Sequence, residues 1–243
     1  MIRFQQVCKT FAGTEVVHGL DLTVAPGELF GFLGPNGAGK TTTIRMATGM
    51  LRPSSGTISI AGFDVHRDGA QVRRRIGHVP DQPYLYDKLT GREFLEFSSA
   101  LYGVEPAIAS KRSSELLEMF DLVPHADQLC ESYSHGMRQK LVIASVLLHR
   151  PEVIFLDEPT TALDPKSARL VKDHLVELCD QGTTVFMSTH VLEIAERMCD
   201  RIAIIDRGRI VALGTCDELS RSDGHASLEE AFLAITADLD EHA

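Results

Sequence analysis

The stretch LFGFLGPNGAGKTT, at positions 29–42, decides the fold. Its first five residues are apolar or glycine, which is typical of a short strand buried on both faces of a parallel sheet. The next eight match the G-x-x-x-x-G-K-[ST] pattern of a phosphate-binding loop at every fixed position. We expect a helix over 41–50, directly after the loop. A strand, a glycine-rich loop and a helix in this order predict a binding site for phosphate groups.

The residue types of this loop indicate its chemistry. Glycines let the backbone wrap closely and aim its N–H groups at phosphate oxygens, and the helix N-terminus adds a partial positive charge. The ammonium group of Lys40 can reach the β- and γ-phosphates of a nucleotide, and the Thr41 hydroxyl can bind Mg²⁺. The alternative is a glycine-rich turn without a ligand, which the position between a buried strand and a helix disfavours.

A pair of acidic residues follows a second buried strand. The sequence VIFLDE at 153–158 is four apolar residues and then Asp157 and Glu158. Carboxylates at the C-terminal end of such a strand lie where parallel sheets build their sites. Asp157 can hold Mg²⁺ through its water shell, and Glu158 can polarise an attacking water as a general base. The alternative is a pair of helix-entry acids before Pro159.

A histidine follows a third strand, which we expect at 183–187. His190 comes after Ser188 and Thr189, so it lies at the same edge of the predicted sheet. There its imidazole can contact the γ-phosphate and orient the water. A lone histidine more often has a structural role, but its place beside the predicted phosphate site favours the functional interpretation.

The pattern of apolar residues predicts the wider organisation. Three consecutive helical segments in the middle of the chain predict a helical subdomain inserted between two parts of a sheet. Strands that alternate with helices predict a mostly parallel sheet with right-handed crossovers. We expect an exposed loop at 221–225 before a short C-terminal helix. The expected strands are 2–7, 16–24, 29–33, 57–60, 76–79, 153–156, 183–187 and 201–205, and the expected helices are 41–50, 90–102, 107–120, 136–148, 166–179 and 191–198.

Composition restricts the class of protein further. The 243 residues include 34 acidic and 24 basic ones, a formal charge of −10, so the surface does not attract nucleic acid by charge. Five cysteines without C-x-x-C spacing disfavour a zinc site or disulfide scaffold and favour reduced thiols. No run approaches the about 20 apolar residues of a membrane span, and residues 1–10 lack a signal core. The arginines at 73–75 are expected to form a solvated helix face.

Further motifs resemble those of the ATPase subunits of ABC transporters, and the similarity covers nearly the whole chain. Residues 133–137, YSHGM, resemble the signature motif, with Gln139 just downstream, and ALD at 162–164 resembles the D-loop. An N-K-x-D guanine motif is not present, which argues against a GTPase. The resemblance implies nucleotide contacts by Phe11 on adenine and by Gly34, Pro35, Asn36, Gly37, Ala38, Gly39, Lys40, Thr41, Thr42, Ser134, Gly136 and Asp164, with Lys40, Glu158 and His190 catalytic.

Two motifs depart from the family pattern. The signature reads Ser-His-Gly-Met in place of the commonest Ser-Gly-Gly-Gln. It keeps the phosphate-facing Ser134 and Gly136, and it differs at His135 and Met137. The glutamine expected after the strand at 76–79 is replaced by Asp81 and then Gln82. Either can contribute to the magnesium site, Asp81 by charge and Gln82 by a neutral carbonyl, and the spacing after Pro80 slightly favours Asp81. The alternative for both is a surface turn.

The resemblance also implies an architecture. It is an α/β P-loop NTPase fold with a mostly parallel central sheet, an N-terminal antiparallel β subdomain and an inserted helical subdomain. One ATPase domain would span 1–243, with a RecA-like core and antiparallel part at 1–83 and 151–243, and the signature-bearing helical subdomain at 84–150. The cofactors implied are ATP and Mg²⁺.

The resemblance implies partners as well. ATP would lie between the phosphate loop of one subunit and Ser134 and Gly136 of a second, in a homodimer or a heterodimer. A separate transmembrane permease would dock on the helical subdomain near residues 84–88, with the ATPase on the cytoplasmic face of the membrane. Residues 85–97 and 227–233 resemble the bacterial export branch, although 228–235 can also be a packing helix. The rival classes are a soluble ABC ATPase acting on ribosomes or nucleic acid, and a metabolic P-loop kinase.

Overall fold

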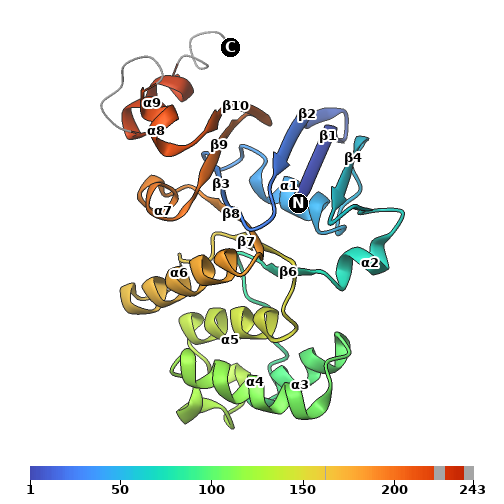
Figure 1. Ribbon diagram of the computed structural model, residues 1–243, viewed down its shortest axis with the longest axis vertical. Helices are drawn as coiled ribbons and strands as arrows, with labels where there is room; N and C mark the ends of the chain where they lie inside the picture. The colour runs from blue at the N-terminus through green and yellow to red at the C-terminus, as the bar shows by residue number, and fades with distance from the viewer. Residues whose placement is uncertain (162, 222–227, 238–243) are drawn as a thin grey trace.

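The computed structural model describes residues 1–161, 163–221 and 228–237. Ala162 of the D-loop resemblance, positions 222–225 of the expected loop and Ser227 lie outside the described residues. The described chain forms an antiparallel sheet, a mostly parallel sheet and a group of helices at the end away from the antiparallel sheet (Figure 1).

The antiparallel sheet is built from the N-terminal part of the chain, as the resemblance implies. Its strand order is β2-β1-β4-β5. A hairpin joins its two long strands through Ala12 and Gly13, which both have positive φ angles, of 46° and 88°. The far end of this hairpin brings Phe11 to the phosphate loop. The strands are β1 (Ile2–Phe11), β2 (Thr14–Val24), β4 (Ser55–Ile60) and β5 (Phe63–Asp64).

The larger sheet has the order β10-β9-β3-β8-β7-β6 and confirms the expected mostly parallel arrangement. Every neighbouring pair is parallel except β9 and β10. All five residues of β3 are buried, as the apolar run before the phosphate loop predicts. Parallel strands end at one edge, so the residues that follow them meet there. The strands are β3 (Leu29–Leu33), β6 (Ile76–Val79), β7 (Val153–Asp157), β8 (Thr184–Thr189), β9 (Arg201–Asp206) and β10 (Arg209–Gly214).

A cluster of aromatic rings joins the two sheets. Phe186 of β8 is fully buried, and its ring centroid lies 5.2 Å from that of Phe32 and 5.6 Å from that of Phe155. The ring of Phe4, from the antiparallel sheet, lies 6.1 Å away. Tilted rings at these separations are favourable beyond the area they bury. These rings cover one face of β3, and Leu29 and Leu33 on its other face belong to a second buried cluster, so the phosphate loop follows a strand packed on both faces.

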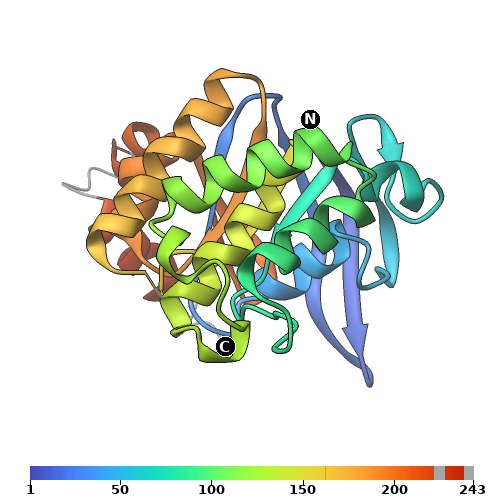
Figure 2. The ribbon, with the colours of Figure 1, turned by 90° about the horizontal axis from the view of Figure 1, so that it is seen from below.

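The helices confirm the segments expected in the middle of the chain to within one residue at each end. They are α1 (Lys40–Ala47), α2 (Gly69–Arg73), α3 (Gly91–Leu101), α4 (Pro106–Met119), α5 (His135–Leu148), α6 (Pro165–Asp180), α7 (Leu192–Met198), α8 (Cys216–Arg221) and α9 (Leu228–Ala237). A capping box starts α3: Thr90 accepts from the Glu93 amide and Glu93 accepts from the Thr90 amide. Seen from the helical end, α3, α4 and α5 lie across the sheet (Figure 2).

Some expectations about secondary structure are wrong. The first strand extends to Phe11, well past the expected residue 7, and β5, β10 and α2 were not expected. The arginine run is not one solvated helix face, because α2 ends at Arg73. The Arg75 guanidinium lies 4.4 Å from the centroid of the Phe63 ring and its Nε lies 3.2 Å from Glu152. Cation–π contact and an ion pair therefore hold Arg75 against the protein.

Candidate nucleotide site

The predicted phosphate loop lines a cavity of about 280 Å³ at the carboxyl edge of the parallel sheet. The cavity brings together side chains from the β1–β2 hairpin, the loop after β3, the start of α1 and the ends of β6 and β7. Its lining residues are Phe11, Val16, Asn36, Gly37, Gly39, Lys40, Thr41, Thr42, Asp81, Asp157 and Glu158. Nearly all were expected from the sequence, and Val16 was missed.

The loop has the backbone conformation that its glycines predict. Gly39 has a φ of 104° and directly precedes α1, and Gly37 has a φ of 84°. A Cβ at Gly34 would lie 2.2 Å from the Ile205 carbonyl oxygen, so a side chain at this position would collide with β9. Conformation therefore favours glycine at positions 37 and 39, and lack of space requires it at position 34.

Lys40 is held in the cavity by oxygen atoms of its own loop and of the acidic pair. The residue is only 6% exposed, and its Nζ donates to the carbonyl oxygens of Gly34 at 2.7 Å and Pro35 at 3.2 Å. Its Nζ also lies 3.6 Å from Glu158 Oε1. These contacts hold the ammonium group at the place where phosphate oxygens would enter.

The acidic pair occupies two different environments. Asp157 is 3% exposed and accepts a short hydrogen bond from the hydroxyl of Ser188 on the neighbouring strand. Glu158 follows with a φ of 49°, a left-handed conformation that costs a non-glycine residue about 1 kcal/mol or more. Its backbone amide donates to the Ser188 carbonyl at 3.2 Å. Both residues are therefore positioned by Ser188, which the sequence interpretation did not single out.

His190 lies beside Glu158, at the edge where the sequence places it. Its Nδ1 lies 2.9 Å from Glu158 Oε1. Because an ionised carboxylate only accepts hydrogen bonds, Nδ1 carries the proton in this contact. Glu158 Oε1 thus lies between the ammonium group of Lys40 and the imidazole N–H of His190.

Of the two residues after Pro80, Asp81 lines the cavity and Gln82 is not among its lining residues. Thr41, Asp81 and Asp157 are oxygen ligands of the kind that Mg²⁺ takes. Among the described residues, the structure contains no group of three or more acidic, histidine or cysteine side chains that could hold a metal alone. This composition fits a magnesium ion that shares its coordination sphere with phosphate oxygens and waters.

Other expected residues are not among the lining residues of this cavity: Gly34, Pro35 and Ala38 of the loop itself, His190 beside Glu158, and Ser134, Gly136 and Asp164. Ser134 is exposed at the start of α5, where its Oγ accepts from the Met137 amide at 3.3 Å. Gly136 follows on the same helical turn. Asp164 caps α6 by accepting from the Ser167 amide at 3.0 Å. Within one chain, the structure therefore does not bring Ser134, Gly136 and Asp164 to the phosphate loop.

Comparisons with known proteins identify the family of this fold and site. The model of the ABC transporter family matches residues 17–161. The daunorubicin/doxorubicin resistance ATP-binding protein of Streptomyces peucetius is 46% identical over 216 residues, which cover 89% of this chain and 66% of that protein. A Nod factor export ATP-binding protein I of Cupriavidus metallidurans is 38% identical over 232 residues, which cover 96% of this chain and 77% of that protein.

Solved structures agree with the sequence relatives. An ATP-binding subunit of an ABC transporter has a TM-score of 0.92 and 32% identity, covering 97% of this chain and 99% of that one. A dimeric ATP-binding cassette in a post-hydrolysis state, bound to ADP and Pi, has a TM-score of 0.82 and 27% identity, covering 88% of this chain and 98% of that one. The fold and the site define a P-loop ATPase. The chain belongs to the ABC transporter family, as one of its ATP-binding cassettes. In the described part of the chain, every helix is too short or too polar to cross a membrane.

Proposed function

We propose that two of these cassettes enclose ATP between them and that its hydrolysis drives export through a separate membrane subunit. The position of Ser134 is the observation that supports this proposal most directly. It is exposed at the N-terminus of α5, outside the nucleotide cavity of its own chain. A second copy can present this helix N-terminus, with the backbone N–H groups of its first turn, to a γ-phosphate. The nucleotide site is complete only when two chains meet.

Within this site, we assign roles to the cavity residues by their chemistry. Lys40 leaves its three oxygen contacts for the β- and γ-phosphates, and the exposed ring of Phe11 receives the adenine. Glu158 takes the proton of the attacking water as general base, and His190 orients that water against the γ-phosphate. Ser134, Gly136 and Asp164 belong to the partner-facing side. Thr41, Asp81 and Asp157 would hold Mg²⁺, which would neutralise phosphate charge.

The membrane partner has a candidate docking site away from the nucleotide. A cavity of about 860 Å³ lies between α1, α2 and the end of α3. Its lining includes Met50, 64% exposed, and Leu101, 69% exposed. Arg73 and Arg74 line it as well. Apolar side chains beside two arginines fit an amphipathic segment of a permease that carries acidic residues.

The direction of transport and the location rest on the relatives. The named relatives are a drug-resistance protein and a Nod factor export protein. Their similarity to this chain supports an export system, with the cassette on the cytoplasmic face of the membrane. Identifying a six-helix membrane protein encoded in a neighbouring reading frame, and then measuring its binding to this chain, tests this part. Leu101→Glu should abolish co-purification and leave ATP hydrolysis unchanged.

The two-chain site is tested with Glu158→Gln. We expect this variant to bind ATP, not to hydrolyse it, and to change from monomer to dimer in ATP and Mg²⁺, as measured by light scattering. Ser134→Arg added to Glu158→Gln should keep the protein monomeric, because it places a bulky side chain at the contact. ADP in place of ATP serves as the control. A monomer at saturating ATP would contradict the proposal.

A further inference from the structure

We propose that His149 and Tyr102 are positioning residues that clamp α5, the helix with Ser134 at its start, to β6, the strand that leads to Asp81. His149 is the C-cap of α5 and Tyr102 is the C-cap of α3. Their rings are parallel, with centroids 3.6 Å apart and an interplanar angle of 7°. His149 Nε2 lies 3.1 Å from the carbonyl oxygen of Ile76, the first residue of β6. One imidazole thus joins two helices of the helical part to a strand of the sheet.

The protonation of this imidazole follows from its surroundings. A carbonyl oxygen only accepts hydrogen bonds, so Nε2 carries the proton. Nδ1 is buried and has no hydrogen-bond partner in the described structure. Burial lowers the pKa of His149, so the ring is neutral at neutral pH. A buried nitrogen without a partner is unfavourable, so the ring is held in this position by its stack with Tyr102 and its hydrogen bond to Ile76.

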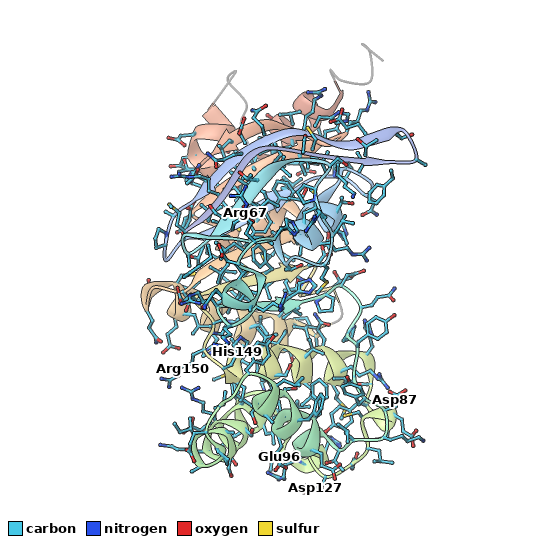
Figure 3. All side chains as sticks on the ribbon, turned by 90° about the vertical axis from the view of Figure 1, so that its right-hand side faces the viewer. Arg67, Asp87, Glu96, Asp127, His149 and Arg150 are labelled. Atoms are coloured by element: carbon cyan, nitrogen blue, oxygen red, sulfur yellow. The ribbon has the colours of Figure 1, made fainter. Side chains whose placement is uncertain are left out.

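The space around β6 shows how closely α5 lies against it. A Cβ at Gly77 would lie 2.3 Å from Val146 Cγ1 of α5 and 3.2 Å from Cγ of Pro151. The absence of a side chain at Gly77 therefore lets the end of α5 rest directly on the strand. Figure 3 labels His149 and its neighbour Arg150, which lie where the helical part meets the sheet.

The opposite end of α5 is attached to the nucleotide site. Gln139 Nε2 donates to the Pro159 carbonyl at 3.4 Å, one residue after Glu158. The Lys140 Nζ lies 3.9 Å from Asp164. Contacts at both ends make α5 a strut between the loop after β7 and the start of β6. A change in tilt of α5 must then move Ser134 relative to Asp81.

The clamp also lies against the proposed docking cavity. Tyr102 and Ile76 both line the 860 Å³ cavity, so a permease segment seated there would touch one face of the Tyr102 ring while His149 covers the other. This inference rests on the proposed function, because it assigns His149 the task of orienting Ser134 for a second chain.

The test compares variants in the Glu158→Gln background. His149→Leu removes both the stack and the hydrogen bond. We expect it to weaken the ATP-dependent dimer at least tenfold in Kd and to leave ADP affinity within twofold, because the Lys40 cradle is untouched. His149→Gln keeps a donor for the Ile76 carbonyl, and His149→Phe keeps the stack, so each should restore part of the loss. Tyr102→Phe should behave as the parent and Tyr102→Leu should weaken the dimer.

A matched control separates positioning from a general loss of stability. Ile143→Val trims a buried side chain on the same helix and leaves the ring stack with Tyr102 and the hydrogen bond to Ile76 in place. In the His149→Leu monomer, amide hydrogen exchange should become faster at residues 76–79 and at the end of α5. In the Ile143→Val monomer, it should stay unchanged at these residues, when the two variants are compared at the same loss of Tm. Equal exchange in the two variants, or equal dimer Kd, would overturn the clamp. If the Glu158→Gln parent stays monomeric in ATP, the proposed two-chain site is wrong. The comparison of hydrogen exchange would then still show whether His149 clamps α5 to β6.

Discussion

The replacement of Glu158 by glutamine tests the geometry of the cavity before any chemistry takes place. Glu158 Oε1 lies 3.6 Å from Lys40 Nζ, and both side chains are largely buried. The carboxylate therefore competes with an incoming phosphate for the same ammonium group. The neutral amide of Glu158→Gln competes less, so we expect the variant to bind ADP more tightly than the unchanged protein does.

The distance gives the size of the effect. Two unit charges 3.6 Å apart attract by about 1 kcal/mol at the dielectric constant of water and about 5 kcal/mol at an effective value of 20. The lower figure treats the pair as fully solvated and corresponds to an about fivefold lower Kd. Since a glutamine carbonyl still accepts from Lys40, we take this lower figure as the expected change.

ADP is the right ligand for this measurement because it lacks the γ-phosphate that the proposed second chain would contact. Isothermal titration calorimetry in the presence of Mg²⁺ gives its Kd without a contribution from dimer formation. Glu152→Gln is the matched control, since it removes the same charge from an exposed pair with Arg75 outside the cavity. An ADP affinity of Glu158→Gln that is equal to or weaker than that of the control would refute the reasoning.

Two further predictions concern stability. Phe186→Ala removes the ring at the centre of the aromatic cluster. Such truncations cost about 3–5 kcal/mol of stability, so calorimetry should show a Tm lowered by about 6–20 °C. Phe97, which is 38% exposed, is the control, and a Tm loss no larger than that of Phe97→Ala would contradict the role of the cluster. Burial raises the pKa of Cys179 from 9.0 to about 12, so the unfolded chain loses its thiol proton first and stability should fall as pH rises from 9 towards 12. Urea titrations of Cys179→Ala should show a smaller fall, and an identical pH profile would disprove the assignment.

The sequence predicts well the features that are encoded by neighbouring residues. The phosphate loop and the acidic pair are contiguous motifs next to apolar runs, so their order already places Lys40 and Asp157 at one edge of a parallel sheet. The helices α3, α4 and α5 are found because their apolar residues recur with a helical period over three or more turns.

What the sequence does not reveal depends on contacts between distant segments. Ser188 donates a hydrogen bond to Asp157 because the register of β7 and β8 places these two residues opposite each other. The sequence of either strand alone does not determine this register. Arg75 leaves the expected helix face because Phe63 and Glu152 attract it. The short strand β5 was missed because two residues show no period.

The left-handed backbone at position 158 sets a conflict for protein engineering. Glycine adopts a φ near 49° without the steric cost that glutamate bears, so Glu158→Gly should relieve strain in the resting protein while it removes the carboxylate. A library selected only for heat tolerance would therefore enrich glycine at this position. The selected variants would be stable proteins that no longer hydrolyse ATP. Any stabilisation campaign on this scaffold needs a turnover screen in every round.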